Sequence, residues 1–410
     1  MHSVRHGSVE NVTVSLGTNQ IIAANPCRRA WIEVSLDAIQ HNVQVLRTLL
    51  PRSTRIMAVV KADAYGHGLA PVAVAVHAAE PTCAFGVATL DEAIEVRRAV
   101  PTAEVFLLSP AYPEMAQEVV DAGVVPVVSD ASFARALACA GERCGRVVRV
   151  HVEVDTGMGR NGVSPTELGE LCRAIQSETT LRLDGVMTHF ADAEQSYDGT
   201  LAQLGTFERA IGALTKEGIP SVCRHACNTA GILLYPEAHY DMVRPGLGVY
   251  GLLPQLGKPA ASPPMVPALE LRARVLLVRK MARGTRLSYG GTHVLPRDSK
   301  IAVLGIGYGD GLPWHLSNKC DALLHGRRVS IVGRICMDVC LVDVTDVPAV
   351  RAGDIATLIG VEGTERIRAE DLARTLGTTE HEITTRLGSR LPRLYTGSVL
   401  QSGGSSFGGG

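Results

Sequence analysis

The stretch that decides the fold runs from Ile56 to Val100 and reads IMAVVKADAYGHGLAPVAVAVHAAEPTCAFGVATLDEAIEVRRAV. Two short apolar runs in it, IMAVVK (56–61) and CAFGVA (83–88), have the length and content of buried strands. Apolar residues at helical spacing follow each run, at 69–79 and 90–100. A strand followed by a crossover helix is the unit from which parallel α/β folds are built. The stretch therefore predicts two consecutive strand–helix units.

The same alternation continues along the chain. Further strands are predicted at 104–108, 124–128, 147–154, 183–190, 221–227 and 240–244. Further helices are predicted at 37–50, 113–123, 132–142, 165–177 and 201–217, with a short segment at 231–238. Eight strands in this rhythm match a (β/α)8 TIM-type barrel of about 250 residues. An open doubly wound sheet is the alternative, but no GxGxxG fingerprint follows the first strand. We therefore expect a barrel over 31–267.

The rhythm changes near Pro264 and Pro267. From residue 268 the sequence consists of strands separated by turns, which predicts a mostly antiparallel β domain over 268–400. One helix is expected within this domain, at 369–377. Residues 1–30 lack periodicity and are expected to form an N-terminal extension, and the Gly- and Ser-rich residues 401–410 are expected to form a flexible tail.

Composition excludes several classes of partner. Forty Lys and Arg balance 41 Asp and Glu, so no basic field attracts nucleic acid or an anionic membrane. No apolar run reaches the roughly 18 residues of a membrane helix, and the N-terminus lacks the apolar core of a secretory signal. The ten cysteines are scattered, which favours reduced thiols in a cytoplasmic protein. No metal site is expected, because CRHAC (223–227) has no second cluster at zinc spacing.

Polar residues gather where the predicted strands end. In the strand 147–154 four valines alternate with polar residues that include Arg149, His151 and Glu153. The valines must face the helices, so the polar set is expected to point into the barrel. Active sites of such barrels lie at the carboxyl ends of the strands. Other predicted strands also end in polar residues, so these residues are expected to meet at that face of the barrel.

Lys61 ends the first predicted strand. A lone lysine at this position would most often be a solvated residue on the rim. Here Arg160, His189 and Arg244 are expected on the same rim, and nearby cations and burial both lower the pKa of a lysine. Such a lysine is a competent amine nucleophile for Schiff-base chemistry. Gly246 and the glycine two residues later free backbone N–H groups that could hold an anion such as a phosphate.

At these residues the sequence resembles the alanine racemase family. AVVKADAYGHG (58–68) is similar to the family's signature around the lysine that carries pyridoxal phosphate (PLP). Seven further motifs are similar to family motifs in the same order, so the resemblance spans about 31–395. They are DTGMGRNG (155–162), THF (188–190), HACNTA (225–230), VRPGLGVYGL (243–252), SYGGT (288–292), GIGYGDG (305–311) and GRICMD (333–338).

The resemblance implies a PLP-dependent racemisation of alanine that supplies D-alanine for cell-wall peptidoglycan. Lys61 would carry the cofactor and act as the base for the D-substrate. Tyr289 would act as the base for the L-substrate, contributed by the second subunit of a homodimer. Arg160 would bind the substrate carboxylate, and Met337 would line the substrate side from the partner chain. One base on each face of the substrate is what racemisation needs, since a single base would return the proton to the face it left.

The resemblance also implies how the cofactor is held. Arg244 would face the pyridine nitrogen, and His189 would lie beside the ring and hydrogen-bond Tyr289 or Arg244. The residues expected to hold the phosphate are Tyr65, Thr229, Gly246 and Leu247. An arginine gives up its proton very reluctantly, so the ring nitrogen would stay unprotonated.

The sequence departs from the family pattern at two places. Glu153 stands where many members have a lysine modified by CO2, and we expect its carboxylate to pair with Arg160 and orient it; the alternative is a carboxylate that merely balances a nearby arginine. Ser389, or Gly388 if the alignment slips by one, stands where some members have a tyrosine near the phosphate. The smaller residue could admit serine or other small amino acids. Tyr308 is equally well read as an entrance gate or as a strand aromatic.

Two other functions are compatible with the same residues. A PLP-dependent decarboxylase can have the same barrel-plus-β architecture, but it would typically place a carboxylate by the pyridine nitrogen, where Arg244 is expected. A catalytically inactive PLP-binding protein would not need both Lys61 and Tyr289. Both observations favour the racemase.

Overall fold

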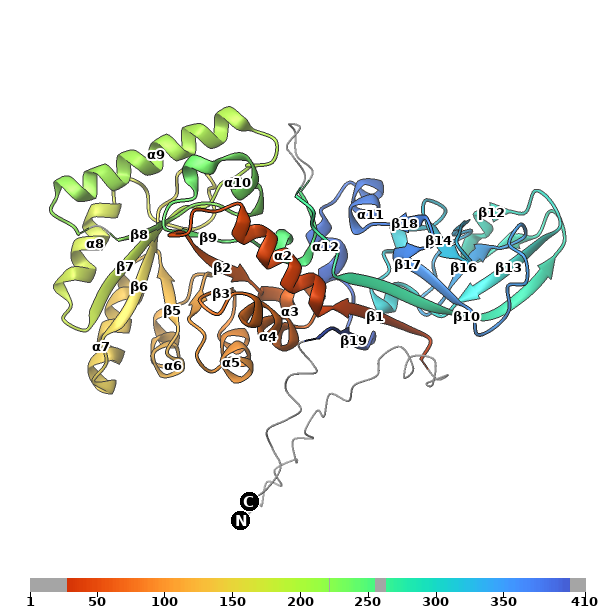
Figure 1. Ribbon diagram of the computed structural model, residues 1–410, viewed down its shortest axis with the longest axis horizontal. Helices are drawn as coiled ribbons and strands as arrows, with labels where there is room; N and C mark the ends of the chain where they lie inside the picture. The colour runs from red at the N-terminus through yellow and green to blue at the C-terminus, as the bar shows by residue number, and fades with distance from the viewer. Residues whose placement is uncertain (1–27, 221, 255–262, 399–410) are drawn as a thin grey trace, which may run out of the picture.

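The computed structural model describes residues 28–220, 222–254 and 263–398. Figure 1 shows a helix-clad barrel beside an elongated β domain, joined by the long strand β10 (Leu269–Met281) and by β1 (Ala30–Ser35). The expected tail at 401–410 and nearly all of the expected extension at 1–30 lie outside the described residues.

Eight parallel strands close into the barrel, each hydrogen-bonded to the next and the last to the first. In order they are β2 (Arg55–Val59), β3 (Ala84–Val87), β4 (Val105–Leu107), β5 (Val125–Val128), β6 (Val148–Glu153), β7 (Leu181–Met187), β8 (Cys223–His225) and β9 (Met242–Val243). Each of them overlaps one of the predicted strands. The predicted fold class is confirmed.

Helices surround the barrel (Figure 1). They are α2 (Leu36–Thr48), α4 (Leu69–Ala79), α5 (Leu90–Ala99), α6 (Ala116–Ala122), α7 (Ala131–Cys144), α8 (Leu168–Ser177), α9 (Tyr197–Lys216) and α10 (Thr229–Leu234). None of the helices in the described ranges is long and apolar enough to cross a membrane.

Strand β6 shows how side-chain alternation builds the two sides of the barrel wall. Its valines are buried in the core that also contains the helices. The intervening His151 and Glu153 point inward and are only 1% and 3% exposed. Near the amino-terminal end of the same strand, Arg149 forms ion pairs with Glu104 and Asp184. The predicted inward direction therefore holds for His151 and Glu153. It places the Glu153 carboxylate at the carboxyl end of the strand.

Strand β10 is the centre of the β domain. It pairs antiparallel with β1, β13 (Ser299–Leu304) and β17 (Ile355–Glu362). The remaining strands are β11 (Arg286–Leu287), β12 (His293–Val294), β14 (Asp321–Leu324), β15 (Arg327–Ser330), β16 (Cys340–Asp343), β18 (Glu365–Ile367) and β19 (Arg393–Thr396). The helix expected at 369–377 is present as α11 (Ala369–Leu376), and it is followed by a helix that was not predicted, α12 (Glu380–Thr385).

The structure differs from the expected barrel boundary at residue 31. Strand β1 lies in the sheet of the β domain, between β10 and β19, with Ile32 opposite Leu271 and Arg393. The barrel part of the chain therefore begins with α2. The sequence AWIEVS could form a strand in either domain. Its partner in β10 lies more than two hundred residues away, so no local pattern indicates which sheet it joins.

Candidate active site

A cavity of about 780 Å³ opens at the carboxyl ends of the barrel strands. Nine of the residues predicted for the site line it: Lys61, Tyr65, Glu153, Arg160, His189, Thr229, Arg244, Gly246 and Leu247. They come from five of the eight strand ends, as the barrel fold requires. The two remaining predicted residues, Tyr289 and Met337, do not line this cavity.

Lys61 lies close behind the end of β2 and in the cavity wall. Burial lowers the pKa of its ammonium group, and the positive charge of Arg160 lowers it further, while the carboxylate of Glu92 acts in the opposite direction. A lysine with a lowered pKa has a larger fraction of neutral amine, which is the nucleophilic form. Of the three neighbours expected to lower the pKa of Lys61, Arg160 is the one that does so here, after burial.

Arg244 is buried beneath the cavity and fixed by four hydrogen-bonding partners. Its guanidinium contacts Nδ1 of His225 at 2.8 Å, the Thr188 carbonyl at 2.6 Å, the Ala226 carbonyl at 3.0 Å and Nδ1 of His189 at 3.3 Å. Burial lowers the pKa of Arg244 to about 10. The arginine therefore stays charged at neutral pH and can only donate hydrogen bonds.

The Arg244 contacts fix the state of the histidines around it. Because Arg244 donates to Nδ1 of His225, that ring carries its proton on Nε2, which donates to Nδ1 of His151 at 2.8 Å. Burial lowers the pKa of His225 well below its usual value, and burial with the charge of Arg244 lowers the pKa of His189 to about 3. Both rings are neutral, so Arg244, Arg160 and Lys61 provide the positive charge around the cavity.

The phosphate side of the cavity is built around Thr229 and Gly246. The Thr229 hydroxyl oxygen accepts the backbone N–H groups of Gly246 at 3.2 Å and Gly248 at 3.1 Å, which leaves its own O–H free to donate. A Cβ on Gly246 would lie 2.6 Å from the Tyr65 hydroxyl, so a larger residue there would displace the Tyr65 ring. Burial raises the pKa of Tyr65 to about 12 and keeps its hydroxyl a donor. A lysine amine, a buried arginine and hydroxyl donors beside a glycine backbone form a set that fits PLP.

Glu153 differs from expectation in one respect. It lines the cavity, but it makes no ion pair with Arg160 in the described part of the chain. Burial raises the pKa of Glu153, and the charges of Arg244 and Arg160 and a hydrogen bond from Asn161 oppose this rise. Arg160 therefore acts on Glu153 through its charge and without a direct ion pair, and the role of Glu153 in orienting Arg160 stays a prediction. A glutamate is shorter than a modified lysine, and Asn161 lies closer to its carboxylate than the exposed Arg160 does.

Tyr289 and Met337 lie on the β domain and point outward, with 71% and 53% of their surface exposed. Ser288 positions the tyrosine: it has a positive φ of 59° and its hydroxyl donates to the Arg334 carbonyl at 2.5 Å. Met337 is held next to Tyr308 by the hydrogen bond from the Gly309 N–H to the Met337 carbonyl at 2.8 Å. Tyr308 is itself 43% exposed, and it lies in a short 3-10 turn rather than in a strand.

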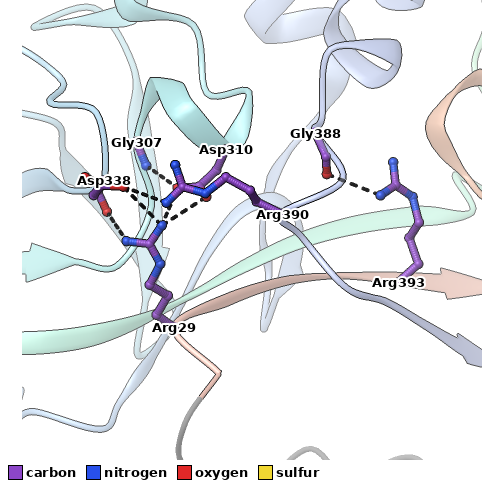
Figure 2. A network of polar contacts seen from close by, with 7 residues as sticks. All are labelled: Arg29, Gly307, Asp310, Asp338, Gly388, Arg390 and Arg393. Carbon is purple, nitrogen blue, oxygen red and sulfur yellow. Dashed lines mark hydrogen bonds and ion pairs between the residues drawn. The ribbon is translucent and has the colours of Figure 1, made fainter.

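An ion-pair network holds these β-domain loops in place (Figure 2). Asp310 is almost fully buried and lies 3.2 Å from Arg29 and 3.3 Å from Arg390. Asp338, next to Met337, pairs with Arg390 at 2.6 Å and Arg29 at 3.4 Å. The network thus links the loops that carry Tyr308 and Met337 to each other.

Three cavity-lining residues of the β domain were missed from the sequence: Thr379, His381 and Thr385. They belong to α12 or directly precede it, and the His381 ring lies 5.3 Å from the Tyr65 ring. A six-residue helix leaves little periodicity to recognise, and nothing in TTEHEITTR indicates that it folds back onto the barrel. Ser389, by contrast, is exposed and does not line the cavity.

Comparison with known proteins agrees with this geometry. Residues 34–254 match the family described as alanine racemase, N-terminal domain, and residues 268–395 match alanine racemase, C-terminal domain. The chain belongs to the alanine racemase family. It is therefore a PLP-dependent amino acid racemase, an isomerase, and its relatives support alanine as the substrate. The family also favours a racemase over a decarboxylase or an inactive PLP-binding protein.

Two relatives and two solved structures illustrate the likeness. The alanine racemase of Symbiobacterium thermophilum is 41% identical over 373 residues, which cover 91% of this chain and 98% of the relative. The alanine racemase of Desulfovibrio desulfuricans is 39% identical, and the match covers 90% of this chain and 98% of the relative. The alanine racemase structure from Streptomyces coelicolor A3(2) has a TM-score of 0.86 at 34% identity, and the match covers 92% of this chain and 100% of that one. The one from Bartonella henselae, with covalently bound pyridoxal phosphate, has a TM-score of 0.81 at 29% identity, covering 90% and 100%.

Proposed function

We propose that the protein interconverts L-alanine and D-alanine with two bases, Lys61 on one face of the substrate and Tyr289 of the partner subunit on the other. The observation that carries the proposal is the convergence of nine predicted residues in one cavity that Tyr289 of the same chain does not line. Tyr289 is instead 71% exposed on the β domain. A second copy of the chain would supply the second base.

The cofactor would be held by residues that already line the cavity. Lys61 would bond it covalently, Arg244 would face the pyridine nitrogen, and Tyr65, Thr229, Gly246 and Leu247 would bind the phosphate. When bound, PLP acidifies the Cα–H bond of an amino acid by acting as an electron sink. Arg244 keeps its own proton, because its pKa remains about 10, so it would leave the ring nitrogen unprotonated. An unprotonated ring nitrogen draws less of the negative charge away from Cα. This disfavours side reactions that need that charge spread over the whole ring.

The side chains of the cavity divide the remaining work. Arg160 would bind the substrate carboxylate through its guanidinium, which can form two parallel hydrogen bonds. The Lys61 amine would remove or return the proton on one face of Cα, and the Tyr289 hydroxyl would do so on the opposite face. His189, neutral and hydrogen-bonded to Arg244, would orient the tyrosine that approaches from the partner. Met337 would close the substrate side.

A homodimer with shared sites can be tested by mixing two inactive variants. Lys61→Ala chains keep Tyr289, and Tyr289→Phe chains keep Lys61, so a mixed dimer has one intact site and one doubly damaged site. With random exchange half of the dimers are mixed, and the mixture should regain about one quarter of the wild-type activity. The two variants alone serve as controls. A mixture that stays inactive although mass spectrometry shows mixed dimers would place both bases in one chain and contradict the proposal.

The biological setting extends the same proposal. We infer a cytoplasmic enzyme that supplies D-alanine for peptidoglycan, as the family resemblance implies. From the replacement of a larger tyrosine by Ser389 we also infer activity on serine or other small amino acids, although Ser389 does not line the cavity of its own chain. A panel of L-amino acids assayed for their D-enantiomers tests this extension, and activity confined to alanine would refute it without affecting the two-base proposal.

A further inference from the structure

The turn that follows Lys61 has an unusual backbone. Ala62, Asp63, Ala64 and Tyr65 all have positive φ angles, between 52° and 54°, and Gly66 follows at 82°. A left-handed turn of four consecutive L-residues is disfavoured, because each Cβ crowds the neighbouring carbonyl oxygen. Such a conformation persists only where the surrounding structure holds it. The turn matters for the site because it begins at the lysine that lines the cavity.

Contacts within the barrel restrain the first part of this turn. The Ala62 N–H donates to Glu92 at 2.6 Å, and Asp63 accepts the Leu69 N–H at 2.9 Å. The Tyr65 ring stacks on the Tyr250 ring with 4.9 Å between their centroids. These contacts come from barrel elements, and His67 Nδ1 also lies 3.0 Å from the carbonyl oxygens of Ala64 and Tyr65. They leave the carbonyl of Gly66, at the end of the turn, to be bonded from elsewhere.

Arg393 of β19 holds that end. Its Nε donates to the Gly66 carbonyl at 3.0 Å and lies 3.5 Å from the Asp63 carboxylate. Its other nitrogens donate to the carbonyls of the same C-terminal segment, Leu387 at 3.0 Å, Leu391 at 3.2 Å and Gly388 at 3.3 Å. The side chain is only 15% exposed. One guanidinium therefore joins the left-handed turn of the barrel to the segment 387–391 of the β domain.

The neighbouring Arg390 provides a contrast within the same segment. Figure 2 shows Arg390 directed at Asp310 and Asp338, and Arg393 set apart from them with its bond to Gly388. Arg390 anchors the segment to the β domain only. Of the two arginines, only Arg393 reaches the barrel turn. Comparing variants of the two therefore distinguishes anchoring of the segment in the β domain from contact with the turn.

We propose that Arg393 is a positioning residue for Lys61: by joining the Gly66 carbonyl and the Asp63 carboxylate to residues 387–391, it holds the left-handed turn that keeps the lysine amine in the cavity. The inference rests on the proposed role of Lys61 as the residue that bonds PLP. It adds a requirement for the β domain of the same chain, in addition to the proposed contribution of Tyr289 to the partner's site.

The test measures how fast Lys61 captures PLP in full-length apoenzyme. PLP is added, samples are quenched with borohydride, and the trapped adduct on the Lys61 peptide is quantified by mass spectrometry. Arg393→Gln should slow trapping on the order of tenfold or more, since several hydrogen bonds to a charged group are lost. Asp63→Asn, which keeps the acceptor for the Leu69 N–H, should slow it less. Arg393→Lys should restore only part of the rate, because one ammonium cannot reach both Gly66 and Leu387.

Arg390→Gln is the matched control, because it removes an arginine and its ion pairs from the same segment. It should keep the wild-type rate of trapping even if its thermal stability falls. Trapping at the wild-type rate in Arg393→Gln, or equal slowing in Arg390→Gln, would overturn the proposal. If Arg393→Gln does not fold, Asp63→Asn decides, and a wild-type rate there overturns it. An adduct that forms on another lysine in the wild type would instead refute the proposed function of Lys61.

Discussion

Replacing Gly66 by alanine tests how closely the Lys61 turn packs on the β domain. An added Cβ at Gly66 would lie 2.2 Å from the carbonyl oxygen of Thr384 and 3.0 Å from its carbonyl carbon. Gly218, just after α9, has a similar φ, 79° against 82°, but an added Cβ there meets nothing within 4 Å. The two substitutions share the conformational penalty and differ only in the collision.

The expected magnitudes follow from these two contributions. A left-handed backbone costs an alanine about 1–2 kcal/mol, and this applies to both variants. The collision at Gly66 involves backbone atoms of α12 that cannot rotate away, and overpacking of this kind costs about 1–3 kcal/mol more. Gly66→Ala should therefore lose about 2–5 kcal/mol in total, against about 1–2 kcal/mol for Gly218→Ala.

Urea unfolding followed by circular dichroism measures the difference. Protein and PLP concentrations are kept equal for the wild type and both variants, because a bound cofactor stabilises the folded state. Gly66→Ala should also contain less PLP after purification, while Gly218→Ala should contain the wild-type amount. Equal destabilisation and equal PLP content in the two variants would mean that the turn does not press against Thr384, and the reasoning would be refuted.

Three further predictions concern the cavity. The rate at which Lys61 captures PLP should rise with pH through an inflection below the usual lysine value of 10.5, and Arg160→Gln should move that inflection upward, because Arg160 lowers the Lys61 pKa; an unmoved inflection would contradict this. Activity should not depend on bicarbonate, because Glu153 already has a carboxylate. Glu153→Gln should raise the KM for alanine more than it lowers kcat, because it removes the negative charge beside Arg160, whereas Glu153→Lys should become bicarbonate-dependent; a wild-type KM in Glu153→Gln would make Glu153 a bystander. His381→Ala should weaken PLP binding by up to about tenfold through lost contact with the Tyr65 ring, and Glu382→Ala on the same helix should not; equal losses in fluorescence titrations would point to general loosening of α12.

The sequence predicts the barrel and most of its site because both follow local rules. Strands such as IMAVVK are compact apolar runs, and a TIM barrel brings the residues that end them to one face. Lys61, Arg160, His189 and Arg244 can therefore be placed together from the order of strands and helices alone. The alternation of strand β6 likewise indicates which of its residues point inward.

The features that sequence reasoning missed depend on distant contacts. Strand β1 takes its place from partners around Leu271 and Arg393, and α12 is positioned by packing on Tyr65. The left-handed turn after Lys61 runs against local preference, since alanine favours a right-handed helix. It forms because contacts from other parts of the chain hold it. The distance between Glu153 and Arg160 is hard to predict for a related reason: the sequence gives the charge of each side chain, but its reach depends on the folded loop.

The central claim, racemisation of alanine by two bases on opposite faces, is tested most directly by the hydrogen at Cα of the product. L-alanine is incubated with the enzyme in D2O, and the reaction is stopped at low conversion. D-alanine is separated on a chiral column, and its deuterium content is measured by mass spectrometry. Two bases predict that the first D-alanine formed carries deuterium at Cα, because its proton comes from a group that did not remove the original one. D-alanine that retains the substrate's own hydrogen would indicate a single base, and no D-alanine at all would contradict the proposed function.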